Sequence, residues 1–95
     1  MNTIEQTEEF EAWIEGLSDP KAQKAIAREI VKFEGGLFAD VKAIGKISEA
    51  RIHYGPGYRI YFARTGHTIY LLLAGGTKRT QKKDIEKAIA LAAGL

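Results

Sequence analysis

The chain has 95 residues, of which 45% are hydrophobic, with two histidines and no cysteine. A chain of this length has enough apolar side chains for one core, so we expect residues 1–95 to form a single domain. The lack of cysteine excludes disulfides, thiolate catalysis and cysteine-based metal sites, and His53 and His67 alone make a poor metal-ligand set. We therefore expect no metal and no cofactor.

The net charge of +2 hides an uneven distribution. Residues 1–50 carry 6 Lys/Arg and 10 Asp/Glu, a balance of −4, whereas residues 51–95 carry 8 and 2, a balance of +6. Residues 1–7 contain neither a basic nor an apolar leader segment, and no apolar run approaches the roughly 18 residues of a membrane span. These features predict a cytoplasmic protein without a membrane partner, whose basic half binds an anionic partner.

Capping residues predict two helices in the first third of the chain. Thr7 is a typical N-cap before a stretch with apolar residues at helical spacing. Asp19 and Pro20 are a typical cap and first residue of a second helix, which should end at Gly35-Gly36. The preceding residues, 3–6, are predicted to form a short strand.

From Ile47 onward the apolar period changes to two, which indicates strands. Turn residues separate three segments, so adjacent segments should pair antiparallel; the predicted strands are Ile47–Tyr54, Tyr58–Arg64 and Thr68–Leu73. A last helix is predicted from about Thr80, with its apolar face formed by Ile85, Ala88, Ile89 and Ala92.

This order of elements predicts an α+β fold, in which two N-terminal helices pack on one face of a small antiparallel sheet followed by a C-terminal helix. The other face of the sheet should then be exposed. Because side chains alternate along strands, that exposed face should carry four polar or aromatic residues: Arg51, His53, Arg59 and Tyr61. We take this face as the candidate functional surface.

The residue types on this face suit phosphate chemistry. Arg51 and Arg59 could clamp a phosphate, because guanidinium groups match its oxygens and keep their charge; alternatively they are solvated, or pair with Glu49. His53 could transfer a proton near neutral pH, although it could equally be a plain exposed histidine. Tyr61 could stack on a base, or simply pack in the core.

A cationic run follows the last predicted strand. Lys78, Arg79, Lys82 and Lys83 could contact the backbone of a nucleic acid, although such a run can also be a solvated loop. The preceding Gly75-Gly76 lacks the spacing of a phosphate-binding loop, which excludes a nucleoside-triphosphate site of that kind.

Two motifs of this sequence resemble those of a known family. They are Arg51-Ile52-His53-Tyr54-Gly55-Pro56-Gly57-Tyr58-Arg59 and Gly75-Gly76-Thr77-Lys78, the latter continued by Gln81-Lys82-Lys83-Asp84-Ile85. Together they resemble the RelE/ParE superfamily of bacterial toxins, in particular the phage-related, HigB-like "addiction module killer" branch. The resemblance covers nearly the whole chain and matches the predicted order of elements.

This resemblance implies the toxin of a type II toxin–antitoxin system. RelE-like members are mRNA interferases, metal-independent endoribonucleases that cleave mRNA on the ribosome and so inhibit translation. The implied partners are a cognate antitoxin, mRNA on the ribosome and, only through the antitoxin complex, operator DNA. The alternative is a ParE-like toxin, which binds and poisons DNA gyrase and cleaves nothing.

The resemblance also implies roles for individual residues. Arg59 matches the strand arginine of the family, Arg51 matches a basic residue before the hairpin turn, and Lys78 or Arg79 matches the basic residue after the last strand. The C-terminal tyrosine or histidine of some relatives is absent, which leaves His53 or Lys82 as the candidate base. The expected catalytic residues are thus Arg51, His53, Arg59, Lys78 and Arg79, and the expected RNA-binding residues are Tyr61, Lys82 and Lys83.

Overall fold

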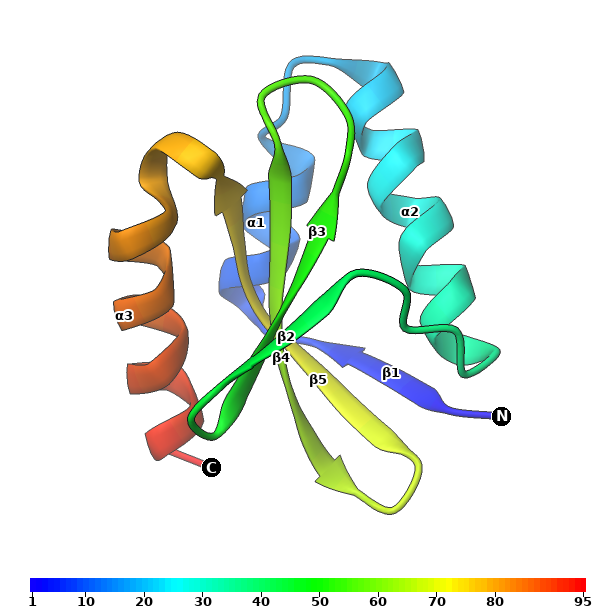
Figure 1. The fold of residues 1–95 in the computed structure, drawn as a ribbon, viewed down its shortest axis with the longest axis vertical. Helices are drawn as coiled ribbons and strands as arrows, with labels where there is room; N and C mark the ends of the chain where they lie inside the picture. Colours follow the sequence, from blue (N-terminus) through cyan, green and yellow to red (C-terminus); the bar gives the residue numbers. More distant parts are fainter.

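The computed structural model describes all 95 residues, as three α-helices and one five-stranded sheet (Figure 1). The helices are α1 (Glu8–Glu15), α2 (Pro20–Glu34) and α3 (Gln81–Ala93), the last preceded by a 3-10 turn, η1 (Lys78–Thr80). The strands are β1 (Thr3–Gln6), β2 (Val41–Ile44), β3 (Ile47–Ile52), β4 (Tyr58–Gly66) and β5 (Ile69–Thr77). None of the helices combines the length and apolar character needed to cross a membrane.

The sheet has the strand order β1-β5-β4-β3-β2. Strands β2 to β5 pair antiparallel with their neighbours, but β1 lies parallel to β5, with Thr3 opposite Ile69. The α+β class is therefore confirmed, whereas the expectation of a purely antiparallel sheet is wrong. The exception arises because the N-terminal strand pairs with the last strand instead of with one next to it in sequence.

The predicted caps begin the first two helices. The Oγ1 of Thr7 accepts a hydrogen bond from the backbone N–H of Phe10 at 3.1 Å and donates one to the carbonyl of Leu73 at 2.6 Å. The carboxylate of Asp19 accepts from the N–H of Lys21 at 3.0 Å. Thr7 thus caps α1 and also ties it to β5.

Helices cover both faces of the sheet, so the expectation that one face is exposed is wrong. On one face, α1 and α2 bury an apolar cluster that includes Phe10, Ile26, Phe33, Ile60 and Phe62. On the other face, α3 packs through Ala88 against a second cluster that includes Ile47, Tyr61 and Leu73. Figure 1 shows α3 on the opposite side of the view from α2, with the strands between them.

Two adjacent glycines let helices approach both faces of β5. A Cβ on Gly75 would lie 2.2 Å from the ring of Trp13 in α1, and a Cβ on Gly76 would lie 1.7 Å from the carboxylate of Asp84 in α3. Because successive strand residues face opposite sides, each glycine admits one helix. Gly75-Gly76 is thus a packing device within β5, where the sequence suggested only a loop.

Candidate functional site

The predicted site residues separate into two exposed clusters with a buried arginine between them. Arg51 and His53 lie at the end of β3, and four further cations surround the start of α3: Lys78, Arg79, Lys82 and Lys83. Arg59 lies on β4 between the two. The spacing of the strands therefore distributes the cations along a surface and does not gather them into one pocket.

Asp40, which precedes β2, organises the first cluster. Its Oδ1 accepts a hydrogen bond from Nη2 of Arg51 at 2.9 Å, and its Oδ2 bonds Nε2 of His53. The carbonyl of Asp40 also accepts from the backbone N–H of Arg51 at 3.0 Å. Arg51 pairs with Asp40 and forms no salt bridge with Glu49, the partner that the sequence suggested.

These contacts determine the ionisation of the cluster. The hydrogen bond from Arg51, followed by that from His53, lowers the pKa of Asp40 below its ordinary value of 3.8. The same carboxylate raises the already high pKa of Arg51. Near neutral pH both groups are therefore charged, and Asp40 can act only as a hydrogen-bond acceptor.

Arg59 is buried, contrary to the expectation that it lies on an exposed face. The residue is only 7% exposed, and its Nη1 donates a hydrogen bond to the carbonyl of Gly57 at 2.5 Å. Its Nε has no hydrogen-bond partner, and no carboxylate forms a salt bridge with it. A buried guanidinium without a carboxylate is costly, so this site favours an anion that approaches from outside.

Tyr61 is also buried, with no exposed surface, because α3 covers it. Burial, followed by the nearby carboxylate of Glu49, raises the pKa of its hydroxyl. The carboxylate of Glu49 accepts a hydrogen bond from Gln81 at 2.8 Å, while the Tyr61 hydroxyl has no partner of ordinary hydrogen-bond geometry. The expected exposure of Tyr61 is therefore wrong, and its ring cannot stack on an RNA base in this conformation.

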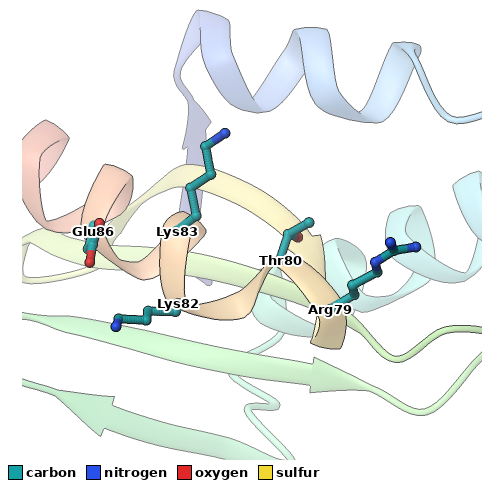
Figure 2. A pocket seen from close by; sticks show the side chains of 5 residues that line it. All are labelled: Arg79, Thr80, Lys82, Lys83 and Glu86. Carbon is teal, nitrogen blue, oxygen red and sulfur yellow. The ribbon is translucent and has the colours of Figure 1, made fainter.

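The second cluster is an open array of cations at the start of α3. Arg79, Thr80, Lys82, Lys83 and Glu86 line a hollow of about 400 Å³ that contains no hydrophobic residue. Figure 2 shows Lys82 and Lys83 projecting to opposite sides of the helix, with Arg79 directed away from both. No salt bridge engages any of these cations. Such a divergent arrangement suits an extended polyanion better than a compact anion.

The sheet register connects the two clusters. Arg51 lies opposite Arg59, and Arg59 lies opposite Gly76, immediately before Thr77 and Lys78. Because neighbouring strands are about 4.8 Å apart, the backbone distance from Arg51 to Gly76 is about 10 Å. We call this series, from Arg51 through Arg59 to Lys78, the arginine row. It places cations on β3, on β4 and at the turn that follows β5.

Asp40 is the residue that the sequence analysis missed. It lies in the segment between α2 and the short edge strand β2, which was not predicted. The sequence did contain a usable signal, the glycine at position 45. Gly45 lies in the turn between β2 and β3 and has a φ of +58°. Recognising that turn would have paired β2 with β3 and placed Asp40 beside Arg51. No three His, Cys, Asp or Glu side chains lie close enough together to hold a metal ion.

Comparison with known proteins gives one informative match. A protein of Haemophilus influenzae strain Rd, described as uncharacterized, is 38% identical over 90 residues, which cover 94% of this chain and 91% of the relative. The chain therefore belongs to the same family as that protein. No family model matches the chain, and no solved structure matches it either.

Proposed function

We propose that this protein is the toxin of a type II toxin–antitoxin system of the RelE/ParE kind and that it cleaves mRNA on the ribosome. The observation that carries the proposal is the arginine row, continued by exposed cations that have no carboxylate partners. A cationic surface of this kind attracts a phosphate backbone, and the motifs around Arg59 and Lys78 resemble those of the toxin family.

The proposed reaction is a transesterification within the RNA. The ribose 2′-oxygen forms a bond to the adjacent phosphorus, the bond from phosphorus to the 5′-oxygen breaks, and the products are a 2′,3′-cyclic phosphate and a 5′-hydroxyl. His53 takes the proton of the 2′-hydroxyl, and the departing 5′-oxygen takes a proton from solvent. Arg51 stabilises the charge that develops on the phosphoryl oxygens.

The remaining cations act on the rest of the strand. Lys78, Arg79, Lys82 and Lys83 are exposed and contact neighbouring phosphates, whereas Arg59 adds positive potential from beneath the surface. Tyr61 has no contact with RNA in this proposal because α3 covers it. A small acidic antitoxin is the proposed partner in the cytoplasm, and operator DNA is bound only through that complex.

One observation favours the alternative, a ParE-like toxin that binds DNA gyrase without cleaving RNA. The hollow at the start of α3 contains no histidine, and His53 lies in the separate groove beside α2. If a partner protein binds only at the start of α3, no base is required. The two functions differ in which cellular process stops first after induction.

The deciding experiment is to induce the protein and to map the ends of translated messages by primer extension. We expect cuts within codons, and we expect the Lys82→Ala/Lys83→Ala variant to produce far fewer of them. The matched control is Lys21→Ala/Lys24→Ala, which removes two exposed lysines near the start of α2. Intact messages accompanied by gyrase-dependent DNA breaks would establish the alternative.

A further inference from the structure

His53 lies on a surface that does not fix its ring by packing. Its side chain is 75% exposed, whereas that of Asp40 is 33% exposed. A ring with so much solvent around it rotates freely unless a hydrogen bond holds it. The bond between Nε2 of His53 and Oδ2 of Asp40 is the only hydrogen bond that the ring makes.

We propose that Asp40 is a positioning residue, which holds His53 with its proton on Nε2 and leaves Nδ1 free to accept a proton. The inference rests on the proposed RNA cleavage, because it names the residue that orients the base of that reaction. An ionised carboxylate can only accept, so the nitrogen that it faces must carry the hydrogen. The opposite nitrogen then has a free lone pair. Orienting carboxylates have this effect on other histidine bases.

Arg51 explains why the carboxylate stays in place. It binds Oδ1 of Asp40 at 2.9 Å, so each carboxylate oxygen serves one partner. The backbone bond between Arg51 and Asp40 fixes the segment at the same position. Asp40 thereby sets the relative placement of a phosphate-binding cation and a base, which a transesterification site requires close together.

The surrounding groove has charged groups that could compete for His53. It has a volume of about 390 Å³ and is bounded on the α2 side by Arg28, Glu29 and Lys32, and on the β3 side by Arg51 and Tyr54. Glu29 is the only other carboxylate in this lining, and it forms no salt bridge. Asp40 is thus the one acid that contacts His53, and Glu29 provides a matched control.

In the proposed step, Nδ1 of His53 takes the proton from the 2′-hydroxyl while the 2′-oxygen bonds to phosphorus and the bond from phosphorus to the 5′-oxygen breaks. The 5′-oxygen takes a proton from solvent, and the imidazolium later returns its proton to solvent. Asp40 touches neither RNA nor the reacting atoms, so its removal should slow the reaction only through the two side chains that it holds, His53 and Arg51.

A double-mutant cycle tests this dependence by single-turnover cleavage of ribosome-bound mRNA. We expect Asp40→Ala to slow cleavage by roughly tenfold or more, and His53→Gln by roughly a hundredfold. The double variant should be much faster than the product of the two single losses predicts, because most of the Asp40 effect acts through His53. Glu29→Gln should cleave at the parent rate. Multiplied losses in the double variant would overturn the proposal.

Nitrogen-15 NMR of the imidazole rings provides a readout that does not depend on RNA. Only two histidines contribute, so His53→Gln assigns the signals. In alkaline buffer we expect a proton fixed on Nε2 in the parent and a mixture of both tautomers in Asp40→Ala. A mixture already present in the parent would overturn the positioning role.

The cleavage and NMR experiments together distinguish a failure of the positioning role from a failure of the proposed RNA cleavage. The parent protein could cleave no RNA while Asp40→Ala still converts the fixed Nε2 tautomer of His53 into a mixture. That result would overturn the proposed function and support the positioning role of Asp40. If Asp40→Ala fails to fold, Asp40→Asn replaces it in both experiments. Asparagine keeps an oxygen at only one of the two positions and has an NH2 donor at the other. Because Arg51 can only donate, it should take the oxygen, and the NH2 group then faces Nε2 of His53 and disfavours a proton there, so the Nε2 tautomer is lost as in Asp40→Ala.

Discussion

Two surface carboxylates join segments of the chain that are distant in sequence. Asp19 caps α2 and accepts a hydrogen bond from the hydroxyl of Tyr54 at 2.9 Å, and Asp40 binds Arg51 and His53. The bond from Tyr54 is the main cause that lowers the pKa of Asp19, as the bond from Arg51 is for Asp40. Both carboxylates therefore stabilise the folded state in their ionised forms.

Acid should remove this stabilisation. Because both folded-state pKa values lie below the ordinary 3.8, the contribution is complete above about pH 3.8 and is lost as the pH falls through the folded values. We expect the free energy of unfolding, measured with urea, to fall less between pH 5 and about pH 2 in Asp40→Asn than in the parent. An equal fall in both proteins would show that the Asp40 contacts add no stability.

The buried hydroxyl of Tyr61 lies near the carboxylate of Glu49 but has no partner of ordinary hydrogen-bond geometry, which gives a second prediction at the scale of the residue. Removing an unsatisfied buried polar atom is neutral or favourable, so Tyr61→Phe should leave the free energy of unfolding unchanged or raise it by up to about 1 kcal/mol. Tyr54→Phe serves as the contrast, because it loses the bond to Asp19 and should be less stable than the parent. A marked loss of stability in Tyr61→Phe would mean that its hydroxyl has a partner.

At the scale of the element, local chemistry predicted the helices well. Thr7 and the Asp19-Pro20 pair begin α1 and α2 at the expected residues because a cap acts within a few residues of its own position. The edge strand β2 was missed because three of its four residues are exposed and show no alternation. The face on which α3 packs was also unpredictable, since an apolar stripe indicates burial without naming the partner surface.

The glycines of β5 give a prediction for this scale. Gly75→Ala would place a Cβ inside the contact distance of the Trp13 ring, and the crowded packing should lower the free energy of unfolding by about 1–3 kcal/mol. Gly94→Ala is the matched control, because the nearest atom to its new Cβ would lie 3.6 Å away. Thermal or urea unfolding of the two variants would measure the difference. Equal stability would mean that α1 moves away from β5 at little cost.

At the scale of the whole molecule, the charge division seen in the sequence becomes a spatial one. The basic residues 51–95 form β4, β5 and α3, and no salt bridge engages the cations of these three elements. The sequence predicted these cations, but it could not predict that α3 covers Tyr61 or that a buried Arg59 lies between the two clusters. Both facts depend on contacts between elements, which no local pattern contains.

Binding of single-stranded RNA should therefore depend strongly on salt. Each phosphate neutralised contributes about 0.7 to the slope of log affinity against log salt concentration. Replacing Lys78, Arg79, Lys82 and Lys83 together by alanine should reduce that slope by up to about 3. Fluorescence anisotropy over a series of salt concentrations would measure it, with Lys21→Ala/Lys24→Ala as the control. An unchanged slope in the fourfold variant would place the RNA elsewhere.

The parallel pairing of β1 with β5 has a consequence for the biosynthesis of this protein. Thr7 and its partner Leu73 are 66 residues apart, and β5 contacts β1, β4, α1 and α3. At roughly 5–20 residues per second, a ribosome makes β5 about 3 to 13 seconds after β1. The first strand and helix therefore remain without their main docking surface until β5 has been made. The proposed RNA-binding surface can assemble only after α3 has been made, so a chain that has not yet reached α3 lacks it.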